Sequence, residues 1–180
     1  MEVIVPFSAT RPKSRLAGVL SRTERTVFAR AMLDDVLSAV VDAGGEPRVL
    51  ATDSFDPTGN PPVDADPPVT VDTRPLTEAV NAVLADRQPG EDVDALGVVM
   101  ADLALATPEA LRRVFGRSGG DDAVPDVTIA PGRGGGPNAL AVRDPSFRAD
   151  YPCTSYLDHR QPAPHPSASV LTLPRVAMRG

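Results

Sequence analysis

Residues 2–16, EVIVPFSATRPKSRL, decide the fold, because a short apolar run passes directly into a polar, cationic loop. Val3, Ile4 and Val5 do not alternate with polar residues, which is typical of a strand buried on both faces. Such strands belong to parallel sheets that helices cover on both sides. Ligands bind to these sheets at the carboxyl ends of the strands. The loop after this strand is therefore the first candidate for a functional site.

The pattern downstream alternates between helices and strands. Ser21 and Glu24 have capping-box spacing and begin a helix whose apolar residues recur from Phe28 to Val41. We expect strands at 47–51, 69–71, 95–100, 126–130 and 139–143, a helix with Pro75 as its first residue, and a helix from Thr107-Pro108 to Phe115. This alternation predicts an α/β domain with a mostly parallel sheet and helices on both faces.

Composition narrows the class of protein. The 180 residues suffice for one globular domain, and the net charge of −6 does not suit a nucleic-acid-binding surface. The sequence contains no apolar run of transmembrane length, and MEVIVPF lacks the basic segment of a signal peptide. The single cysteine, Cys153, excludes an internal disulfide. We expect a cytoplasmic protein that binds neither nucleic acid nor a membrane.

The charged residues are strongly biased. The chain has 17 arginines and one lysine, Lys13, and 18 aspartates against 6 glutamates. Genome composition and a salt-rich cytoplasm, in which dense carboxylates keep a surface hydrated, both explain this bias. Lys13 stands out against it, since a compact ammonium differs chemically from a guanidinium.

Three loops fall at the expected ligand-binding edge. Lys13, Ser14 and Arg15 suit a phosphate group, although a solvated basic loop would look the same. Asp102 follows an apolar strand and suits Mg²⁺ held together with substrate phosphates, or else it only fixes its own loop. The glycines of 131–138, PGRGGGPN, can form an anion-binding nest or simply a flexible hairpin.

A hydrolase reading is disfavoured. Ser155, Asp158 and His159 are the residue types of a catalytic triad, but they lie too close in sequence to converge as nucleophile, orienter and base. Cys153 is better explained as a buried or idle thiol than as a nucleophile.

Four segments together resemble the 2-phospho-L-lactate guanylyltransferase family, in the family's order. They are VPF with RPKSRL (5–16), MADLALATPE (100–109), APGRGGGPNAL (130–140) and YPCTSYLDH (151–159). The resemblance implies a single-domain nucleotidyltransferase fold of the glycosyltransferase-A, Rossmann-like type. It implies transfer of GMP from GTP to 2-phospho-L-lactate, giving lactyl-2-diphospho-5'-guanosine and pyrophosphate in the biosynthesis of the deazaflavin coenzyme F-420. Mg²⁺ is the implied cofactor, and a homodimer is plausible from the family.

The resemblance also assigns roles to residues. It implies Lys13, Arg15 and Asp102 as catalytic residues, with Asp102 as the metal ligand. The nucleotide-binding residues would be Pro6, Phe7, Lys13, Ser14, Arg15, Gly134, Gly135, Gly136 and Asn138. Ser155 and His159 would bind the acceptor.

Two alternative functions stay open on the sequence alone. The same fold serves nucleotidyltransferases that act on phosphoenolpyruvate or a sugar phosphate. A catalytically inactive GTP-binding module would retain Lys13 and Asp102 without turnover.

The C-terminal segment departs from the family pattern. Pro137 and Pro152 replace residues that would offer a hydroxyl or a backbone N–H. Residues 160–180 contain no Asp or Glu, where relatives carry a TDxD-type segment with metal ligands. We therefore expect a nucleotidyltransferase domain at 1–160, an irregular proline-rich tail at 161–180, and a truncated or altered C-terminus.

Overall fold

The computed structural model describes residues 1–10, 12–56, 66–89, 94–103, 106–116, 124–132 and 137–151, together with the backbone of 168–170. The strands are β1 (Glu2–Phe7), β2 (Glu46–Ala51), β3 (Val69–Val71), β4 (Leu96–Val99), β5 (Val127–Pro131), β6 (Pro137–Val142) and β7 (Ala168–Val170). The helices are α1 (Arg22–Asp42), α2 (Leu76–Arg87), α3 (Pro108–Val114) and a short 3-10 helix, η1 (Ser14–Leu16).

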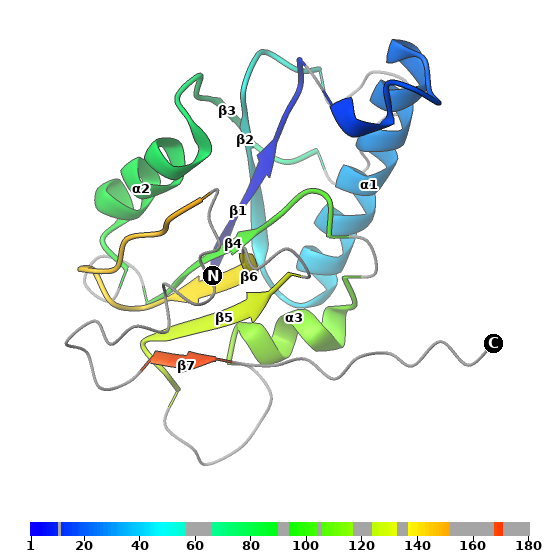
Figure 1. Cartoon of the computed structure of the whole chain (residues 1–180). Helices are drawn as coiled ribbons and strands as arrows, with labels where there is room; N and C mark the ends of the chain where they lie inside the picture. The colour runs from blue at the N-terminus through cyan, green and yellow to red at the C-terminus, as the bar shows by residue number, and fades with distance from the viewer. Residues whose placement is uncertain are drawn as a thin grey trace.

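These strands form one mixed sheet in the order β3-β2-β1-β4-β6-β5-β7 (Figure 1). The pairs β3-β2, β2-β1, β1-β4 and β5-β7 are parallel, so the mostly parallel α/β class is confirmed. β6 runs antiparallel to both of its neighbours, β4 and β5. The carboxyl ends of β1, β2 and β4 consequently meet at one edge of the sheet.

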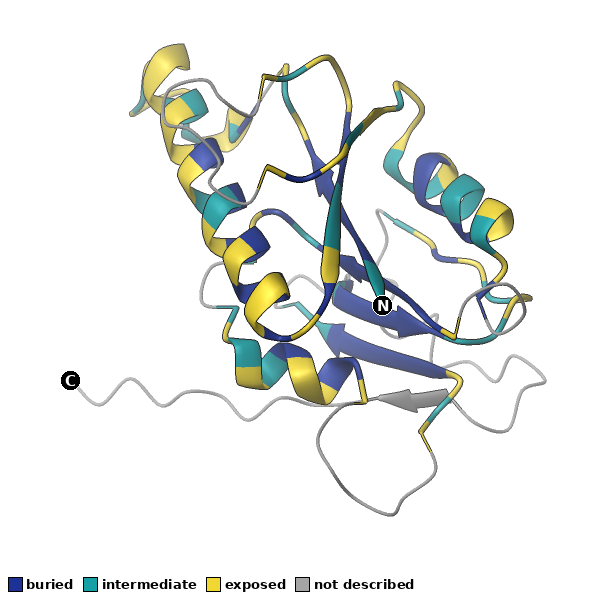
Figure 2. Ribbon diagram, turned by 180° about the vertical axis from the view of Figure 1, so that it is seen from behind, coloured by how far each residue is buried: buried dark blue, intermediate teal, exposed yellow. Residues whose placement is uncertain are grey.

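Helices cover both faces of the sheet and bury two cores. Alternate strand residues such as Val3 and Val5 pack with α1 and α3 on one face, whereas Ile4 packs with α2 on the other. Figure 2 shows the result, with buried strands at the centre and helices whose outer faces are exposed. The buried apolar run at the start of the chain therefore has the role predicted for it.

The predicted capping box begins α1. Ser21 Oγ accepts from the Glu24 amide at 3.3 Å, and Glu24 Oε2 accepts from the Ser21 amide at 2.8 Å. Hydrogen bonds from the Ser21 side chain and backbone to the Glu24 carboxylate hold the pKa of Glu24 below its ordinary value. The predicted apolar stripe of this helix is buried at its centre, whereas Phe28 and Val41 at its two ends are exposed. Leu33, Val36, Leu37 and Val40 of that stripe pack in the core with the sheet, as expected.

Other predicted boundaries hold to within a residue or two. Thr107 Oγ1 caps α3 by accepting from the Ala110 amide, with Pro108 as the first helical residue. Pro75 is the N-cap of α2 and not its first residue. Ser14–Leu16, expected as loop, forms η1.

The tail is less irregular than expected, because Ala168–Val170 form β7 and pair in parallel with β5. The stretch SASVLTL, between Pro166 and Pro174, contains no proline that would prevent such pairing. The rest of 161–180 lies outside the described residues.

Residues 147–151 lie along α2 on the outside of the second core (Figure 1). Asn81 pairs with the Ala149 backbone in both directions, at 2.8 Å each, and Thr77 contacts the backbone of Tyr151. Burial raises the pKa of the Tyr151 phenol. Side chains of α2 therefore hold this segment by hydrogen bonds to its backbone, as a neighbouring strand would do with its own backbone.

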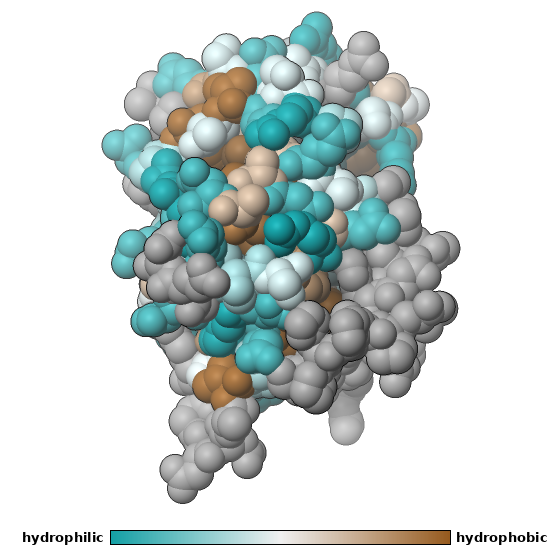
Figure 3. All heavy atoms as spheres, turned by 90° about the vertical axis from the view of Figure 1, so that its left-hand side faces the viewer, coloured by the Kyte–Doolittle hydropathy of each residue, from teal (hydrophilic) through white to brown (hydrophobic). Residues whose placement is uncertain are grey.

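On the face that carries α2, apolar residues form small patches between polar ones (Figure 3). Among the described residues, no helix is long and apolar enough to cross a membrane.

Candidate functional site

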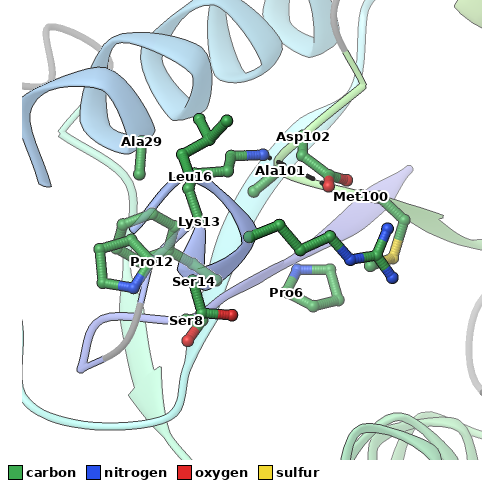
Figure 4. Close-up of a pocket in the computed structure, with 12 residues that line it drawn as sticks. Pro6, Ser8, Pro12, Lys13, Ser14, Leu16, Ala29, Met100, Ala101 and Asp102 are labelled. Atoms are coloured by element: carbon green, nitrogen blue, oxygen red, sulfur yellow. Dashed lines mark ion pairs between the residues drawn. The ribbon is translucent and has the colours of Figure 1, made fainter. Parts of the chain in front are cut away.

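A cavity of about 500 Å³ opens at the carboxyl ends of β1 and β4, beside α1 (Figure 4). Its lining comes from the end of β1, the loop into η1, α1, and the turn after β4. The lining residues are Pro6, Phe7, Ser8, Pro12, Lys13, Ser14, Arg15, Leu16, Ala29, Met100, Ala101 and Asp102. The two loops predicted to share a ligand-binding edge thus form one hollow.

The loop after β1 is fixed by backbone contacts to β2 and within itself. The Phe7 carbonyl accepts from the Thr52 amide at 3.1 Å, and Thr52 Oγ1 accepts from the Ala9 amide at 3.2 Å. Lys13 lies in the left-handed region, with φ 50° and ψ 44°, and its carbonyl accepts from the Leu16 amide. Residues other than glycine rarely adopt this backbone conformation, so contacts with the surrounding residues must hold Lys13 in it.

Arg25, on α1, supplies one of those contacts. Its Nη1 donates to the Pro12 carbonyl at 3.4 Å, directly before Lys13. Its Nε is buried and has no hydrogen-bond partner in the described part of the chain. Sequence reasoning missed this residue, since its place in the first turns of a helix gives no sign of a contact with a loop thirteen positions earlier.

The turn after β4 presents Asp102. The Met100 amide donates to the Asn138 carbonyl of β6 at 2.9 Å, and the Met100 carbonyl accepts from the Leu103 amide at 3.0 Å. These bonds close a tight turn around Asp102, whose side chain is 60% exposed. The carboxylate therefore stands at the mouth of the cavity.

Lys13 and Asp102 meet across the cavity (Figure 4). Lys13 Nζ lies 3.3 Å from Asp102 Oδ2, and the lysine side chain is only 21% exposed. A single contact to an exposed carboxylate leaves both groups able to exchange partners with an entering ligand. The ammonium suits a phosphate oxygen, and the carboxylate suits a hard cation.

The structure brings six of the sequence-predicted site residues together in this cavity: Pro6, Phe7, Lys13, Ser14, Arg15 and Asp102. The ring of Phe7 is buried against Phe55, with 5.2 Å between the ring centroids. Asn138 does not line the cavity, and it contributes through its carbonyl bond to Met100.

The remaining predicted residues lie outside the described part of the chain: Gly134, Gly135, Gly136, Ser155 and His159. Within the described ranges, no group of three or more metal-ligating side chains is found. Asp102 is thus the carboxylate that the described cavity offers a cation, and a bound phosphate would have to complete the ligand set.

A second cavity, of about 170 Å³, lies beside the first at the same edge of the sheet. It opens on the α2 side, and the two cavities share Pro6, Phe7, Ser8 and Met100. Leu50, Leu76 and Ala79 complete its apolar wall, and Thr52, Asp72 and Arg74 are its other polar residues.

Asp72 and Arg74 form a close pair in this second cavity. Arg74 Nε donates to Oδ1 at 3.0 Å, and Nη2 donates to Oδ2 at 2.5 Å. These bonds hold the pKa of Asp72 below its ordinary value and raise the pKa of Arg74. The position of Asp72 directly after β3 could have identified it, by the rule that found Asp102, but a three-residue strand is a weak signal.

Comparison with known proteins identifies the family of this chain. The model for "Guanylyl transferase CofC like" proteins matches residues 1–170. The 2-phospho-L-lactate guanylyltransferase of Halorubrum lacusprofundi is 54% identical over 170 residues, covering 94% of this chain and 74% of that protein. The enzyme of the same name from Haloterrigena turkmenica is 53% identical, covering 96% of this chain and 75% of that protein.

Solved structures share the fold at low sequence identity. A protein from Desulfovibrio desulfuricans G20, named for a nucleotide-diphospho-sugar transferase, has a TM-score of 0.61 at 15% identity, covering 89% of this chain and 68% of that one. A manganese complex from Mycobacterium tuberculosis H37Rv has a TM-score of 0.52 at 13% identity, covering 96% and 88%. The family match and the two relatives agree, and the chain belongs to the CofC-like guanylyl transferase family.

Proposed function

We propose that this chain transfers the guanylyl group of GTP to 2-phospho-L-lactate and releases pyrophosphate. The observation that carries the proposal is the meeting of Lys13 and Asp102, 3.3 Å apart, in one cavity at the carboxyl edge of the sheet. The relatives at 54% and 53% identity bear the name of this activity.

The proposed reaction requires the protein to align its two substrates, and it does not require a nucleophilic side chain. An oxygen of the acceptor's phosphate attacks the α-phosphorus of GTP and forms a new P–O bond. The bond from that phosphorus to the bridging oxygen breaks, and pyrophosphate leaves with the electron pair. The protein has to hold two polyanions in line and neutralise the charge that develops at the α-phosphate.

The cationic loop meets that need in the proposal. Lys13 gives up its contact with Asp102 and binds the triphosphate, while Arg15 offers a planar fork to the same group. The bonds from Thr52 and Arg25 keep the loop in place during the exchange. Pre-organisation of this kind lowers the cost of ordering the loop when GTP binds.

Asp102 is the proposed ligand for a divalent cation. A cation held by one carboxylate and substrate phosphates is the usual arrangement for Mg²⁺, and the exposed Asp102 at the mouth of the cavity fits it. A bound Mg²⁺ would neutralise phosphate charge. A distant relative in fold was solved with manganese, which is in line with a divalent ion.

The test is pyrophosphate release from purified chain with GTP, Mg²⁺ and 2-phospho-L-lactate in multimolar KCl. The high salt matches the acidic composition, because it screens the surface carboxylates. We expect turnover that falls at least about 100-fold in Asp102→Asn. Asp86→Asn, at an exposed carboxylate on α2 outside both cavities, is the matched control and should keep full activity.

Separate reactions with phosphoenolpyruvate and with a sugar phosphate test the acceptor. Faster release with either one would reassign the substrate within the same reaction class. Binding of GTP by folded protein without release of pyrophosphate would identify an inactive GTP-binding module instead.

A further inference from the structure

We infer that Arg30 of α1 is a positioning residue for the first cavity, which Lys13 and Asp102 line. It holds segment 52–56, and that segment fixes the end of β1 from which the cationic loop begins. The inference rests on the proposed function, since it concerns the cavity assigned there to the triphosphate. Arg30 lines neither the first nor the second cavity, so it acts on a ligand through the residues that it contacts. Sequence reasoning did not single it out.

Arg30 is a charged residue on the buried face of a helix. It is 8% exposed and stands at helical spacing from Leu33 and Leu37, which pack in the core. Burying a guanidinium costs free energy that an apolar side chain of similar size would not cost. The contacts of the guanidinium therefore have to account for its presence at this position.

The guanidinium of Arg30 contacts the segment that follows β2. Its Nη2 donates to the Asp56 carbonyl at 2.6 Å, and its Cζ lies 5.0 Å from the centre of the Phe55 ring. The second distance is that of a cation–π contact, which is stronger in a buried place than in water. One arginine therefore fixes two successive residues, one by its backbone and the other by its ring.

Segment 52–56 is joined to the end of β1 at two points. The Phe55 ring packs on the Phe7 ring, with 5.2 Å between the centroids, and the Thr52 amide donates to the Phe7 carbonyl at 3.1 Å. Phe7 is buried and lines the first cavity. The segment thus supports a wall of that cavity, and Arg30 holds the end of the segment that is farther from Thr52.

The same segment also holds the cationic loop, because Thr52 Oγ1 accepts from the Ala9 amide at 3.2 Å. Further along the loop, Arg25 of α1 donates to the Pro12 carbonyl. Helix α1 therefore holds the loop directly through Arg25 and indirectly through Arg30. A loop held in both ways keeps its cations in place before a phosphate arrives, which lowers the cost of binding.

The experiment measures the binding of inorganic triphosphate and of GTP in Mg²⁺ without any acceptor, so that it does not depend on turnover. Arg30→Met keeps an apolar stem and removes the guanidinium. We expect it to bind both ligands about tenfold more weakly than the wild type, because a looser loop has to be ordered on binding. In the transfer reaction, KM for GTP should rise by about the same factor, and kcat should change by less than about twofold.

A double substitution tests whether Arg30 acts through Phe55. Phe55→Leu removes the ring that contacts both Arg30 and Phe7, and it should also weaken triphosphate binding. The double variant should bind about as weakly as the weaker single variant, because both substitutions break the same series of contacts. Losses that multiply in the double variant would overturn the inference. Phe55 is only partly buried, so Phe55→Leu carries the test if Arg30→Met does not fold, and wild-type binding in Phe55→Leu would then overturn the inference.

Arg143→Met is the matched control. Arg143 is also partly buried, its Nη2 donates to the Phe115 carbonyl at 2.7 Å, and it lines neither the first nor the second cavity. This variant should lose stability and still bind triphosphate as the wild type does. Wild-type binding in Arg30→Met, or an equal loss of binding in Arg143→Met, would overturn the inference. Triphosphate binding that depends on Arg30, without guanylyl transfer, would instead leave this inference standing and refute the proposed function.

Discussion

Strand β1 carries an acid–base cluster at each end, and the two clusters differ in how completely the carboxylate is bound. At the amino end, Glu2 accepts from Arg48 Nε at 2.6 Å and lies 3.0 Å from Arg87 Nε. At the carboxyl end, Asp102 makes one ion pair within the described part of the chain, with Lys13 at 3.3 Å. Glu2 is 20% exposed, whereas Asp102 is three times as open to solvent.

The difference separates a stabilising cluster from an exchangeable one. Guanidinium groups from β2 and α2 contact both oxygens of Glu2, so the cluster links three elements of the fold. The Lys13–Asp102 pair gains little from its single exposed contact and loses little when a phosphate and a cation replace it. Similar residue types thus serve stability at one edge and, in our proposal, chemistry at the other.

The largest effect is expected for Lys13→Met, which removes the ammonium and keeps the apolar stem. Transfer activity should fall by about 100- to 1,000-fold in kcat/KM, because the charge on the α-phosphate loses a partner. Lys13→Arg should recover only part of the loss, since a guanidinium differs in size and hydration. The measurement is initial-rate pyrophosphate release.

Thermal unfolding of the same variant supplies the control for Lys13→Met. The free energy of unfolding should change by less than about 0.5 kcal/mol, because Asp102, the carboxylate that loses its partner, is largely exposed. Full activity in Lys13→Met would contradict the proposed role of the Lys13–Asp102 pair in binding the triphosphate and the cation.

At the amino edge, Glu2→Gln should act on stability alone. Removing one charge from a shielded cluster leaves two arginines close together, which should lower the free energy of unfolding by about 2 kcal/mol, or Tm by roughly 4–8 °C. Glu46→Gln is the matched control, because Glu46 is exposed and lies 4.0 Å from the amino terminus. Denaturant unfolding of both variants checks the prediction, and a loss of activity in folded Glu2→Gln would break the comparison between the edges.

The sequence predicts one of these clusters far better than the other. Lys13 and Asp102 follow the ends of apolar strands, and parallel strands bring their carboxyl ends to one edge, so a local pattern suffices to place both residues. The Glu2 cluster needs the register of β1 against β2 and the position of the last turn of α2. No short stretch of sequence contains that information.

The second cavity escapes sequence reasoning for a related reason. Its walls come from β1, β2 and α2, and only the packing of the helix on the sheet creates the space between them. The exposure of Phe28 could not be predicted for a similar reason. Helical spacing identifies a stripe of apolar residues but not the angle at which that stripe packs on the sheet. The chain order of elements is therefore easier to predict than the hollows between them.

The smallest expected effect is the change in stability of Asp102→Asn. It is the most direct test of the difference between the Glu2 cluster and the Lys13–Asp102 pair. The substitution keeps the side-chain size and removes the charge of an exposed carboxylate, so it should lower the free energy of unfolding by less than about 0.5 kcal/mol. The same variant is expected to lose most of its activity. Asp102→Asn would then lose activity and keep stability, whereas Glu2→Gln would lose stability and keep activity. Chemical unfolding of Asp102→Asn beside Glu2→Gln measures the contrast directly. Equal destabilisation by the two substitutions would mean that the Lys13–Asp102 pair is itself a structural tie, and GTP would then have to break a stabilising contact in order to bind.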